Sequence, residues 1–428
     1  MHKSFQKLCI SNSKLKDHFE KLFSGKEITI PPEIEHPEEY HYLKGKLECP
    51  IDESAPNEKE LEDIARSFKN GKSSGTDKVP LEALKYQNSQ KLMQALLLLF
   101  ISIWTLISVP TSWLHSSIVC LYKKGIKSLA KNYRGLSIGA NISRILPQII
   151  LNRISASYEA NIEEHQYGFR KGRSTVDAIF ILSNVIKKCN GRIITIFIDL
   201  TAAYDHIPRD FLFRVVTFRT GSKMMIRLLK KLYEGTTAAI CGSKAKFDVL
   251  CGCRQGGVES PTLFNYYFDF VLKVCADEID RQFPNGWGIV FNYRIPEECS
   301  NRKQRAESGG LTGKEIMRWI LYADDLVLFC KEVDEAQRIL EIIHTTCTRF
   351  GLNISFGKTK TLIFRDDELA AKESILTVAN ESIGNVSEFC YLGHMISNKL
   401  GHSFTDLRIS TATSKFNQLS NMLYVITR

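Results

Sequence analysis

The sequence predicts an α+β fold in which helices cover an antiparallel sheet. Residues 193–198 form a run of strand-forming apolar residues that ends at Asp199. Residues 319–329 place two adjacent aspartates between two apolar runs, which is the pattern of a β-hairpin with a charged tip. A further strand carries Lys358, and stretches with helical spacing separate the three strand regions. These strands and the helices between them define the expected core.

The two aspartates at the hairpin tip, Asp324 and Asp325, indicate a bound cation. Neighbouring carboxylates repel each other, and burying even one of them without a partner is costly. Asp199 is a candidate third ligand; the alternative is that it caps a turn or the next helix. Asp205 and His206 are weaker candidates because both fall within that turn.

Length and charge set the first limits on function. The chain has 428 residues, of which 44% are hydrophobic, so it can bury a sizeable core, and its length predicts two or three subdomains. The formal net charge of +10 suits a polyanionic partner. A basic protein without such a partner is the alternative.

The twelve cysteines predict reduced thiols in an intracellular protein of the cytoplasm or nucleus. Only Cys251 and Cys253 are close in sequence, and C-x-C lacks the spacing of a zinc module. Polar residues interrupt the longest apolar run, Leu92 to Val109, and the N-terminus has no apolar signal core. We therefore expect a buried helix over this run and no association with a membrane.

The first 66 residues are expected to form an N-terminal extension whose acidic second part is a surface segment. A short amphipathic segment around Leu15 and Phe19 precedes a tract from Lys26 to Arg66 with five basic and twelve acidic residues. Such a charge balance repels a phosphate backbone. The Gly- and Ser-rich loop at 69–80 carries three lysines and lacks the P-loop spacing, so it is at most a backbone contact.

Two basic clusters follow. A strand at 117–122 precedes five closely spaced cations, Lys123, Lys124, Lys127, Lys131 and Arg134. This cluster is either a phosphate-contacting finger or a solvated loop. Residues 167–175 interleave Arg170, Lys171 and Arg173 with aromatics and glycines. That pattern suits backbone contact with base stacking, although a solvated turn ahead of a helix is an equal alternative.

The remaining chain alternates between expected helices and strands. A helix over 142–154 contains Pro147, which predicts either a kink or a restart with the proline in the first turn. Ser260 and Pro261 begin another helix, and Gly256 and Gly257 ahead of it leave room for a flat group against the backbone. The other expectations are an irregular surface excursion at 283–314, an amphipathic helix at 335–350, a hairpin at 389–396 and a helix at 403–424.

Three carboxylates on two core strands, a basic channel and a glycine gap predict phosphoryl transfer assisted by two cations. Two ions about 4 Å apart stabilise the attacking and the leaving oxygen, and oxygen ligands favour Mg²⁺. This chemistry needs no protein nucleophile, which agrees with the lack of a convincing Ser/His/Asp or Cys/His arrangement. An Asp strand, a Gln-Gly helix, an Asp-Asp hairpin and a lysine strand, in that order, describe a polymerase palm.

Seven ordered blocks carry a resemblance to a known family: NYRGLSI, QYGFRKGRSTVDAI, FIDLTAAYDHIP, RQGGVESPTLFN, LYADDLVLF, GLNISFGKTK and FCYLGHMIS. The chain resembles the reverse transcriptase of non-LTR (LINE-type) retrotransposons over nearly its whole length. The resemblance implies a right-hand polymerase fold with fingers, an antiparallel-sheet palm and a partial helical thumb.

The same resemblance divides the chain. The expected parts are an N-terminal extension at 1–66, acidic in its second half; fingers and the fingers/palm connection at 67–190; a palm at 191–397 with an insertion near 283–314; and the start of a truncated thumb at 398–428. With no endonuclease before the palm and no complete thumb, zinc knuckle or RNase H after it, we expect a fragment of a longer element.

The resemblance also implies roles for single residues. Asp199, Asp324 and Asp325 match the metal-binding triad for two Mg²⁺ ions, or Mn²⁺, with Asp199 and Asp324 the main ligands. Tyr204 matches the bulky residue that excludes the ribose 2′-hydroxyl, and Lys358 matches the lysine near the leaving pyrophosphate. Further nucleotide-binding candidates are Lys123, Lys124, Arg134, Gln255 and Gly256. Nucleic-acid-binding candidates are Arg170, Lys171, Arg173 and a primer grip at Tyr391, Leu392 and Gly393.

Three positions depart from the family pattern. Gly135 replaces the usual proline, Pro147 stands where a charged or polar residue is favoured, and Val258-Glu259 replaces the commoner Pro-Leu or Pro-Ser. We expect effects on finger rigidity and speed, and none on the type of reaction.

The activity implied by the resemblance is RNA-directed DNA polymerisation, in which a primer 3′-hydroxyl is extended with dNTPs. The implied partners are an RNA template, a DNA primer and dNTPs, and the oligomeric state stays open. One alternative is a catalytically inactive relic that only binds nucleic acid. Another is a group II intron maturase or a telomerase-like enzyme, which would need a dedicated RNA-binding domain that the acidic N-terminus does not offer.

Overall fold

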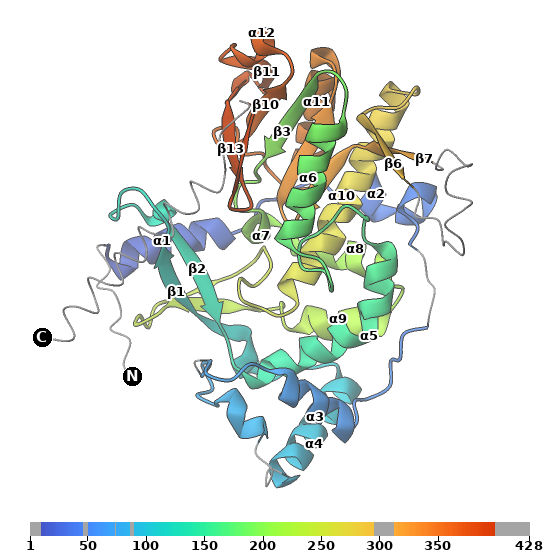
Figure 1. Ribbon diagram of the computed structural model, residues 1–428. Coiled ribbons are helices and arrows are strands. Elements are labelled where there is room, and N and C mark those ends of the chain that lie inside the picture. Colours follow the sequence, from blue (N-terminus) through green and yellow to red (C-terminus); the bar gives the residue numbers. More distant parts are fainter. Residues whose placement is uncertain (1–9, 46–49, 73, 86–89, 295–311, 399–428) are drawn as a thin grey trace, which may run out of the picture. The chain divides into compact units, whose positions relative to one another are not determined.

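The computed structural model describes residues 10–45, 50–72, 74–85, 90–294 and 312–398 (Figure 1). It divides into two compact units, of which the first comprises 1–164, 200–282 and 342–353, and the second 165–199, 283–341 and 354–428. Each unit combines helices with a four-stranded sheet, so the predicted α+β class is confirmed.

A sheet with the order β2-β1-β4-β5 forms one part of the first unit. Its strands are β1 (His115–Tyr122), β2 (Tyr133–Ile138), β4 (Thr237–Ile240) and β5 (Lys246–Asp248). Strands β1 and β2 form an antiparallel hairpin, whereas β1 and β4 run parallel. The helix α1 (Asn12–Phe23) packs the side chains of Leu15, Phe19 and Phe23 into the same apolar cluster as this sheet.

Gly135 on β2 allows the close packing of α1. A Cβ atom at this position would lie 2.7 Å from Cε1 of Phe19, so no larger residue fits beneath the ring. The departure from the family pattern at Gly135 therefore has a packing role here.

Four helices form the core of the first unit: α5 (Ile145–Asn161), α8 (Arg209–Thr220), α9 (Lys223–Lys231) and α10 (Ser260–Gln282). Helix α10 begins at Ser260, as predicted, and is buried over most of its length. Pro147 is the third residue of α5, after a short 3₁₀ turn at Ile142–Arg144. The predicted restart is therefore confirmed, because a proline in the first turn removes no helical hydrogen bond.

Further helices of the first unit are α2 (Pro32–Glu35), α3 (Glu58–Ser67), α4 (Gln90–Leu106) and α7 (Ala203–His206). The expectation of a buried helix over Leu92 to Val109 is wrong in part. Helix α4 buries one face, whereas Leu98 and Leu106 on the other are 66% and 73% exposed. Over the ranges described, none of the helices is both long and apolar enough to cross a membrane.

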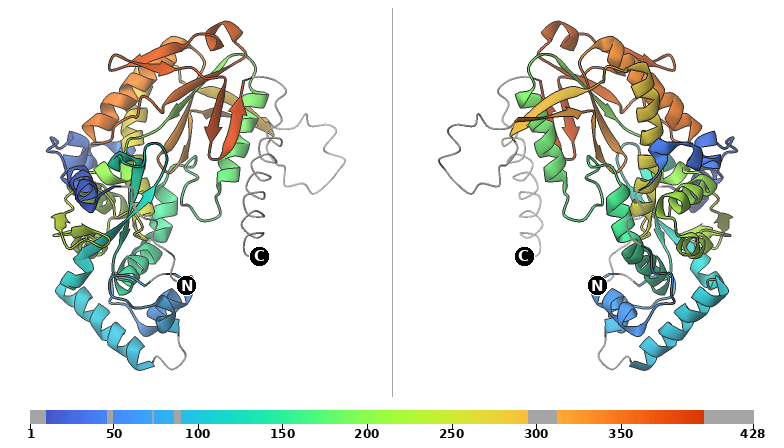
Figure 2. Two further views of the ribbon diagram at one scale, coloured as in Figure 1. Left: turned by 90° about the vertical axis from the view of Figure 1, so that its left-hand side faces the viewer. Right: turned by 90° about the vertical axis from the view of Figure 1, so that its right-hand side faces the viewer.

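The second unit is built on an antiparallel sheet with the order β10-β3-β9-β8. Its strands are β3 (Ile193–Ile198), β8 (Trp319–Tyr322), β9 (Asp325–Cys330) and β10 (Lys360–Phe364). Figure 2 shows α6 (Thr175–Lys188) on one side of this sheet and α11 (Val333–Arg349) on the other. All six residues of β3 are buried, as expected for a central strand that is covered on both faces.

Three two-stranded ladders and one short helix accompany the sheet: β6 (Ile289–Arg294) with β7 (Thr312–Met317), β11 (Ser374–Val378) with β12 (Glu381–Gly384), β13 (Glu388–Tyr391) with β14 (His394–Ser397), and α12 (Asp367–Ala370). The predicted hairpin at 389–396 is confirmed. The irregular excursion predicted at 283–314 is confirmed at 283–288 and wrong at 289–294 and 312–314, where β6 and β7 pair in register. Its middle part, 295–311, lies outside the described residues. The helix predicted at 403–424 lies outside the described residues. Each cysteine in the described ranges has a free thiol, as expected.

A buried ion pair joins the helices of the first unit. Arg219 on α8 is fully buried and donates to Oδ2 of Asp269 on α10 at 2.7 Å. The same guanidinium donates to the backbone carbonyls of Leu43 and Asn161, and Lys273 approaches Asp269 to 3.3 Å. Removing one partner of such a pair leaves an uncompensated buried charge.

We predict that Arg219→Leu lowers the free energy of unfolding by about 3–5 kcal/mol, because Asp269 loses its buried partner. Arg214→Leu is the matched control on the same helix, since Arg214 makes an exposed pair with Asp210. It should cost less than about 1 kcal/mol. Urea denaturation measures both; equal effects of the two variants would contradict this account of the core.

Candidate active site

Three charged side chains lie in a row across the sheet of the second unit. Ile198 on β3 faces Leu326 on β9, so the next residue, Asp199, is set opposite Asp325. Phe197 faces Lys360 on β10, and the same register continued by two residues sets Asp199 opposite Lys358. The Nζ atom of Lys358 donates to Oδ2 of Asp199 at 2.8 Å, as this register requires. The sheet register therefore brings together a lysine and two carboxylates that are far apart in sequence.

A tight turn between β8 and β9 carries the remaining carboxylate. Tyr322 pairs with Asp325, which leaves Ala323 and Asp324 as the two turn residues. Ala323 has a φ of +57°, in the left-handed region that hairpin turns of this length use. The predicted hairpin with a charged tip is thus confirmed, and both aspartates are partly buried at its end.

Gln166 holds this turn in place from the side. Its Oε1 accepts from the backbone N–H of Ala323 at 2.9 Å and from that of Gly168 at 2.8 Å. Its Nε2 donates to the carbonyl of Ala323 at 3.3 Å. A Cβ atom at Gly168 would lie 2.3 Å from the nitrogen of Ala323, so only glycine permits this approach. The two residues fix the backbone on which Asp324 and Asp325 sit.

The electrostatics of the row favour a cation. Burial, together with the charges of Asp324 and Asp199, raises the pKa of Asp325 to about 6, and Lys358 lowers it by less. A carboxyl group that is costly to ionise beside two other carboxylates gains from any added positive charge. Lys358 supplies a positive charge to Asp199, the carboxylate that it contacts.

The donor set fits Mg²⁺, which prefers oxygen ligands. In the described ranges, no three His, Cys, Asp or Glu side chains form a preassembled metal cluster. Mg²⁺ usually keeps several waters and binds through one or two carboxylates together with substrate phosphates. Asp199, Asp324 and Asp325 at one end of the sheet meet that requirement without a closed protein cage.

A second candidate site lies in the first unit, at the turn from Arg254 to Gly257. Gly257 N–H donates to the carbonyl of Arg254 at 2.8 Å, and Gly256 has a φ of +102°. The carbonyl of Gln255 accepts from the N–H of Ser137 on β2 at 2.9 Å. Gln255 and Gly256 are therefore held against the end of a strand, with the backbone of Gly256 free of a side chain.

Asp205 binds the side chain of Gln255. The Nε2 atom of Gln255 lies 2.6 Å from Oδ1 and 2.8 Å from Oδ2 of Asp205. Burial raises the pKa of Asp205 to about 6, against the opposing effects of Gln255, Lys123 and Arg134. Asp205, weighed in the sequence as a weak metal ligand, thus has a distinct partner in the first unit.

Tyr204 lies on α7, next to Asp205. Its ring stacks on Phe264 with centroids 4.4 Å apart and an angle of 13° between the planes. The carbonyl of Tyr204 accepts from the N–H of Cys253 at 2.7 Å. The ring position is therefore fixed by α10 below it and by the segment that leads into Gln255.

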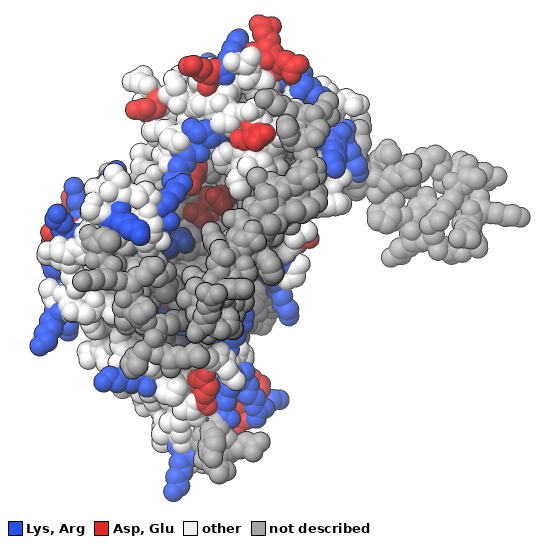
Figure 3. Space-filling view, turned by 60° about the vertical axis from the view of Figure 1, so that its left-hand side comes forward, with Lys and Arg blue, Asp and Glu red and all other residues white. Residues whose placement is uncertain are grey.

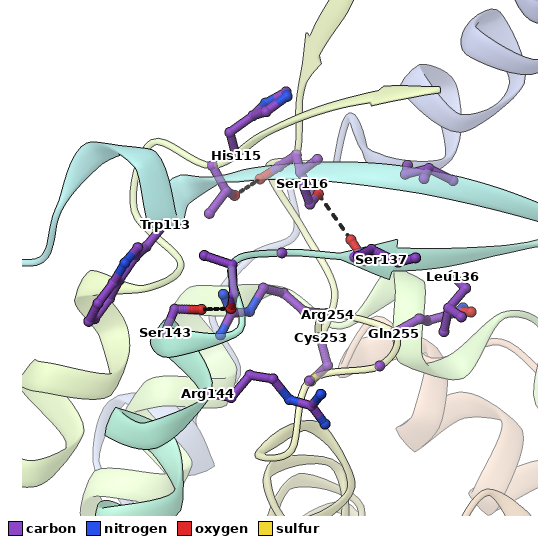
Figure 4. A pocket seen from close by; sticks show the side chains of 18 of the residues that line it. Trp113, His115, Ser116, Leu136, Ser137, Ser143, Arg144, Cys253, Arg254 and Gln255 are labelled. Atoms are coloured by element: carbon purple, nitrogen blue, oxygen red, sulfur yellow. Dashed lines mark hydrogen bonds between the residues drawn. The ribbon is translucent and has the colours of Figure 1, made fainter. Parts of the chain in front are cut away.

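A pocket of about 200 Å³ adjoins the Arg254–Gly257 turn. Figure 4 shows Trp113 at one end and Leu136 and Gln255 at the other, with Ser137 bonded to Ser116 across the strands. The lining combines apolar side chains with polar and charged ones, among them His115, Arg144 and Arg209 besides Arg254 and Gln255 of the turn. A concave site that combines an apolar lining with placed polar groups is a candidate ligand pocket.

The predicted finger cluster lies on the β1–β2 hairpin. Lys123 and Lys124 follow β1, and Arg134 on β2 pairs with Leu121 across the hairpin. All three cations are exposed. Figure 3 shows acidic and basic side chains mixed at the top of the view, where Figure 1 labels α12. The three exposed cations of the hairpin would attract a phosphate backbone.

The second basic cluster is divided by burial. Lys171 is exposed, whereas Arg170 is 8% exposed and donates to the carbonyl of Gln166. Arg173 lies over the ring of Tyr167 at 5.3 Å from its centroid. Lys171 is therefore the residue of this cluster best placed to contact a partner.

The Tyr391–Gly393 segment forms the turn between β13 and β14. Leu392 and Gly393 both have positive φ, of 49° and 77°, whereas Tyr391 is 3% exposed and its ring lies 5.7 Å from that of Phe197. Burial and the charge of Asp325 raise the pKa of Tyr391. Because Tyr391 is buried, Leu392 and Gly393 are the residues of this turn that are accessible to a partner.

Sequence reasoning missed the supporting residues Gln166 and Glu259. Gln166 stands at the start of a block interpreted as a basic cluster, and Glu259 was noted only as a departure from a family pattern. Glu259 is fully buried and pairs with Arg254 at 2.7 Å. A charged residue directly ahead of a buried helix was the available signal.

Comparison with known proteins now adds to this geometry. Residues 121–396 match the family described as "Reverse transcriptase (RNA-dependent DNA polymerase)". The chain is 24% identical over 361 residues to the RNA-directed DNA polymerase from mobile element jockey of Drosophila funebris, covering 80% of this chain and 35% of that protein. It is 27% identical over 386 residues to a probable RNA-directed DNA polymerase from transposon BS of Drosophila melanogaster, covering 85% and 38% respectively.

A third relative is a Pol polyprotein from the type-1 retrotransposable element R2 of Nasonia vitripennis, 24% identical over 291 residues, with 67% of this chain and 25% of that protein covered. The chain thus spans roughly a third or less of the length of these curated relatives. The family match includes every strand of the Asp199–Asp325–Lys358 row. The chain belongs to the reverse transcriptase family, and its relatives place it with the enzymes of non-LTR retrotransposons.

Proposed function

We propose that this chain is an RNA-directed DNA polymerase that extends the 3′-hydroxyl of a DNA primer on an RNA template with dNTPs. The observation that carries the proposal is the row of Asp199, Asp325 and Lys358 across one sheet, with Asp324 in the adjoining turn. We further propose that the fingers and the fingers/palm connection comprise residues 67–190, which include the β1–β2 hairpin, and that the palm comprises residues 191–397.

The three carboxylates and the lysine have separate tasks. Asp199, Asp324 and Asp325 would hold two Mg²⁺ ions, which, when bound, stabilise the attacking and the leaving oxygens. Lys358 neutralises Asp199 at 2.8 Å and, once released from it, donates to the phosphate oxygens of the leaving group. No side chain is required to act as a nucleophile, because the primer hydroxyl attacks directly.

A catalytically inactive relic that only binds nucleic acid is the rival proposal. The exposed cations of the β1–β2 hairpin would serve either protein. Gln166, Gly168 and the Lys358–Asp199 ion pair favour the enzyme, since all three support the geometry of carboxylates that mere binding does not need.

The direct test is primer extension by the purified chain on an RNA template with Mg²⁺. We predict template-directed incorporation, and a loss of about 10²–10³-fold or more in Asp325→Asn and in the double variant Asp324→Ala with Asp325→Ala, because charge stabilisation at the transition state is removed. Asp367→Asn, an exposed carboxylate on α12, is the matched control and should retain full activity.

Activity that survives in the Asp324→Ala, Asp325→Ala variant would overturn the metal assignment. Salt-sensitive RNA binding by the wild-type chain without any incorporation, even when a full-length thumb is supplied, would favour the relic.

Tyr204 is proposed to select deoxynucleotides by excluding the ribose 2′-hydroxyl. We predict that Tyr204→Ala raises the use of rNTPs relative to dNTPs by roughly 10–100-fold, because steric exclusion by one side chain is worth about 1–3 kcal/mol. Tyr204→Phe keeps the ring stacked on Phe264 and should retain the preference of the wild type. Competition between labelled rNTP and dNTP measures the ratio; equal discrimination in both variants would exclude this role.

Asp205 makes the stability of the first unit depend on pH. Its pKa is about 6 in the folded chain and about 3.9 when exposed, so the folded state retains a proton that the unfolded state has lost between these values. The stabilisation of the folded state by the protonated carboxyl of Asp205 is complete below the lower pKa of about 3.9. It is lost as the pH rises through the pKa of about 6 in the folded chain.

We therefore predict that, from pH 4 to pH 8, wild-type stability falls by up to about 3 kcal/mol relative to Asp205→Asn, which cannot ionise. Asp248→Asn, at an exposed position on β5, is the control and should follow the wild type. Denaturation at several pH values measures the difference. A difference that does not vary with pH would contradict the raised pKa.

A further inference from the structure

A cluster of two buried side chains and one partly buried side chain lies behind the Arg254–Gly257 turn. Oε1 of Glu259 accepts from Nη2 of Arg254 at 2.7 Å, from its Nε at 3.0 Å and from the hydroxyl of Tyr233 at 2.9 Å. The guanidinium of Arg254 also lies 5.1 Å from the centroid of the Tyr233 ring. We call Tyr233, Arg254 and Glu259 the Glu259 cluster.

The carboxylate of this cluster packs directly against the turn. A Cβ atom at Gly257 would lie 2.7 Å from Oε1 and 2.9 Å from Oε2 of Glu259. Glu259 has no exposed surface, and its Oε2 has no hydrogen-bond partner among the residues that the structure describes. A buried carboxylate of this kind is costly to keep unless a tightly fixed partner offsets it. The Arg254 side chain is that partner, and the backbone of the turn packs against the carboxylate.

The same turn carries Gln255 and Gly256, the candidate nucleotide-binding residues. Gln255 bonds Asp205 through its side chain and Ser137 through its carbonyl. The carbonyl of Arg254 accepts from Gly257 N–H and from the hydroxyl of Ser260 at 2.6 Å. If Arg254 loses a hydrogen bond and shifts, Gln255 therefore shifts with it, because Gln255 is the next residue along the chain.

We propose that Glu259 is a positioning residue that sets the place of Gln255 and Gly256 for the incoming nucleotide and the template. The proposal rests on the proposed function. Val258-Glu259 stands where the resembling family commonly has a proline followed by an apolar or small residue. Proline limits a turn through its fixed φ, and in this chain the Glu259 cluster limits it through buried hydrogen bonds.

A merely stabilising cluster would behave differently from a positioning one. Replacing a buried ion pair by apolar residues of similar size often retains or raises stability. The double variant Arg254→Met with Glu259→Leu therefore separates the two roles. If the cluster only stabilises, this variant folds and binds nucleotide normally; if it positions Gln255, the variant folds and binds nucleotide poorly.

The activity test measures KM for the dNTP and kcat in primer extension. For Glu259→Gln and for the double variant we expect KM to rise about tenfold with kcat within about threefold of the wild type, since lost ground-state binding raises KM alone. Adding Gln255→Ala to Glu259→Gln should raise KM no further than Gln255→Ala alone, because both act through one side chain. Glu234→Gln, exposed in the same unit, should change neither constant.

A readout independent of activity keeps the proposal testable if the chain does not extend primers. Hydrogen exchange at the amides of Ser137 and Gly257 should be about tenfold faster in Glu259→Gln, because these amides bond the carbonyls of Gln255 and Arg254. The amide of Leu212 on α8 should exchange at the wild-type rate. Unchanged exchange at Ser137 and Gly257, or a folded double variant with the KM of the wild type, would overturn the proposal.

Discussion

Mutual repulsion among carboxylates at one end of a buried sheet is the constraint on which the second unit depends. Asp199 and Asp325 are set opposite each other by the β3–β9 register, and Asp324 adjoins them in the turn. The chain keeps them close by surrounding them with fixed backbone: β3 buried on both faces, the Lys358 ion pair on one side and Gln166 on the other. A slip of one residue in the register of a strand would turn the side chains of that strand to the opposite face of the sheet.

In the first unit, the Arg254–Gly257 turn must likewise hold its residues in a fixed position. Gln255 and Gly256 need an open backbone, which the glycines provide, and a fixed position, which glycines do not. Asp205 on one side and the Glu259 cluster on the other restore the rigidity that Gly256 and Gly257 remove. Both units thus place flexible or repelling groups where the chemistry is proposed to occur, and both hold them with buried polar contacts.

Sequence reasoning predicted what local patterns encode. The Asp324–Asp325 hairpin, the strand before Asp199 and the start of α10 at Ser260 were predicted, because apolar periodicity and capping residues act within a few positions. At Pro147 the sequence left a kink and a restart open, and the structure has the restart, with Pro147 in the first turn of α5. It could not predict the hydrogen bonds of Gln166 to Ala323 or the Arg254–Glu259 ion pair, since these depend on contacts that only the folded chain brings together. It also missed the strands β6 and β7 within the segment expected to be irregular, because their pairing joins residues that a polar stretch of sequence separates.

The most direct test of the central claim is Mn²⁺ binding followed by electron paramagnetic resonance, with a 3′-deoxy-terminated primer on an RNA template and the matching dNTP. The account predicts bound Mn²⁺ at pH 7.5, weaker binding at pH 5.5 where Asp325 takes up a proton, and loss of binding in Asp199→Asn with Asp325→Asn. Equal binding by the wild type and by this double variant would show that the carboxylate row does not hold the cation.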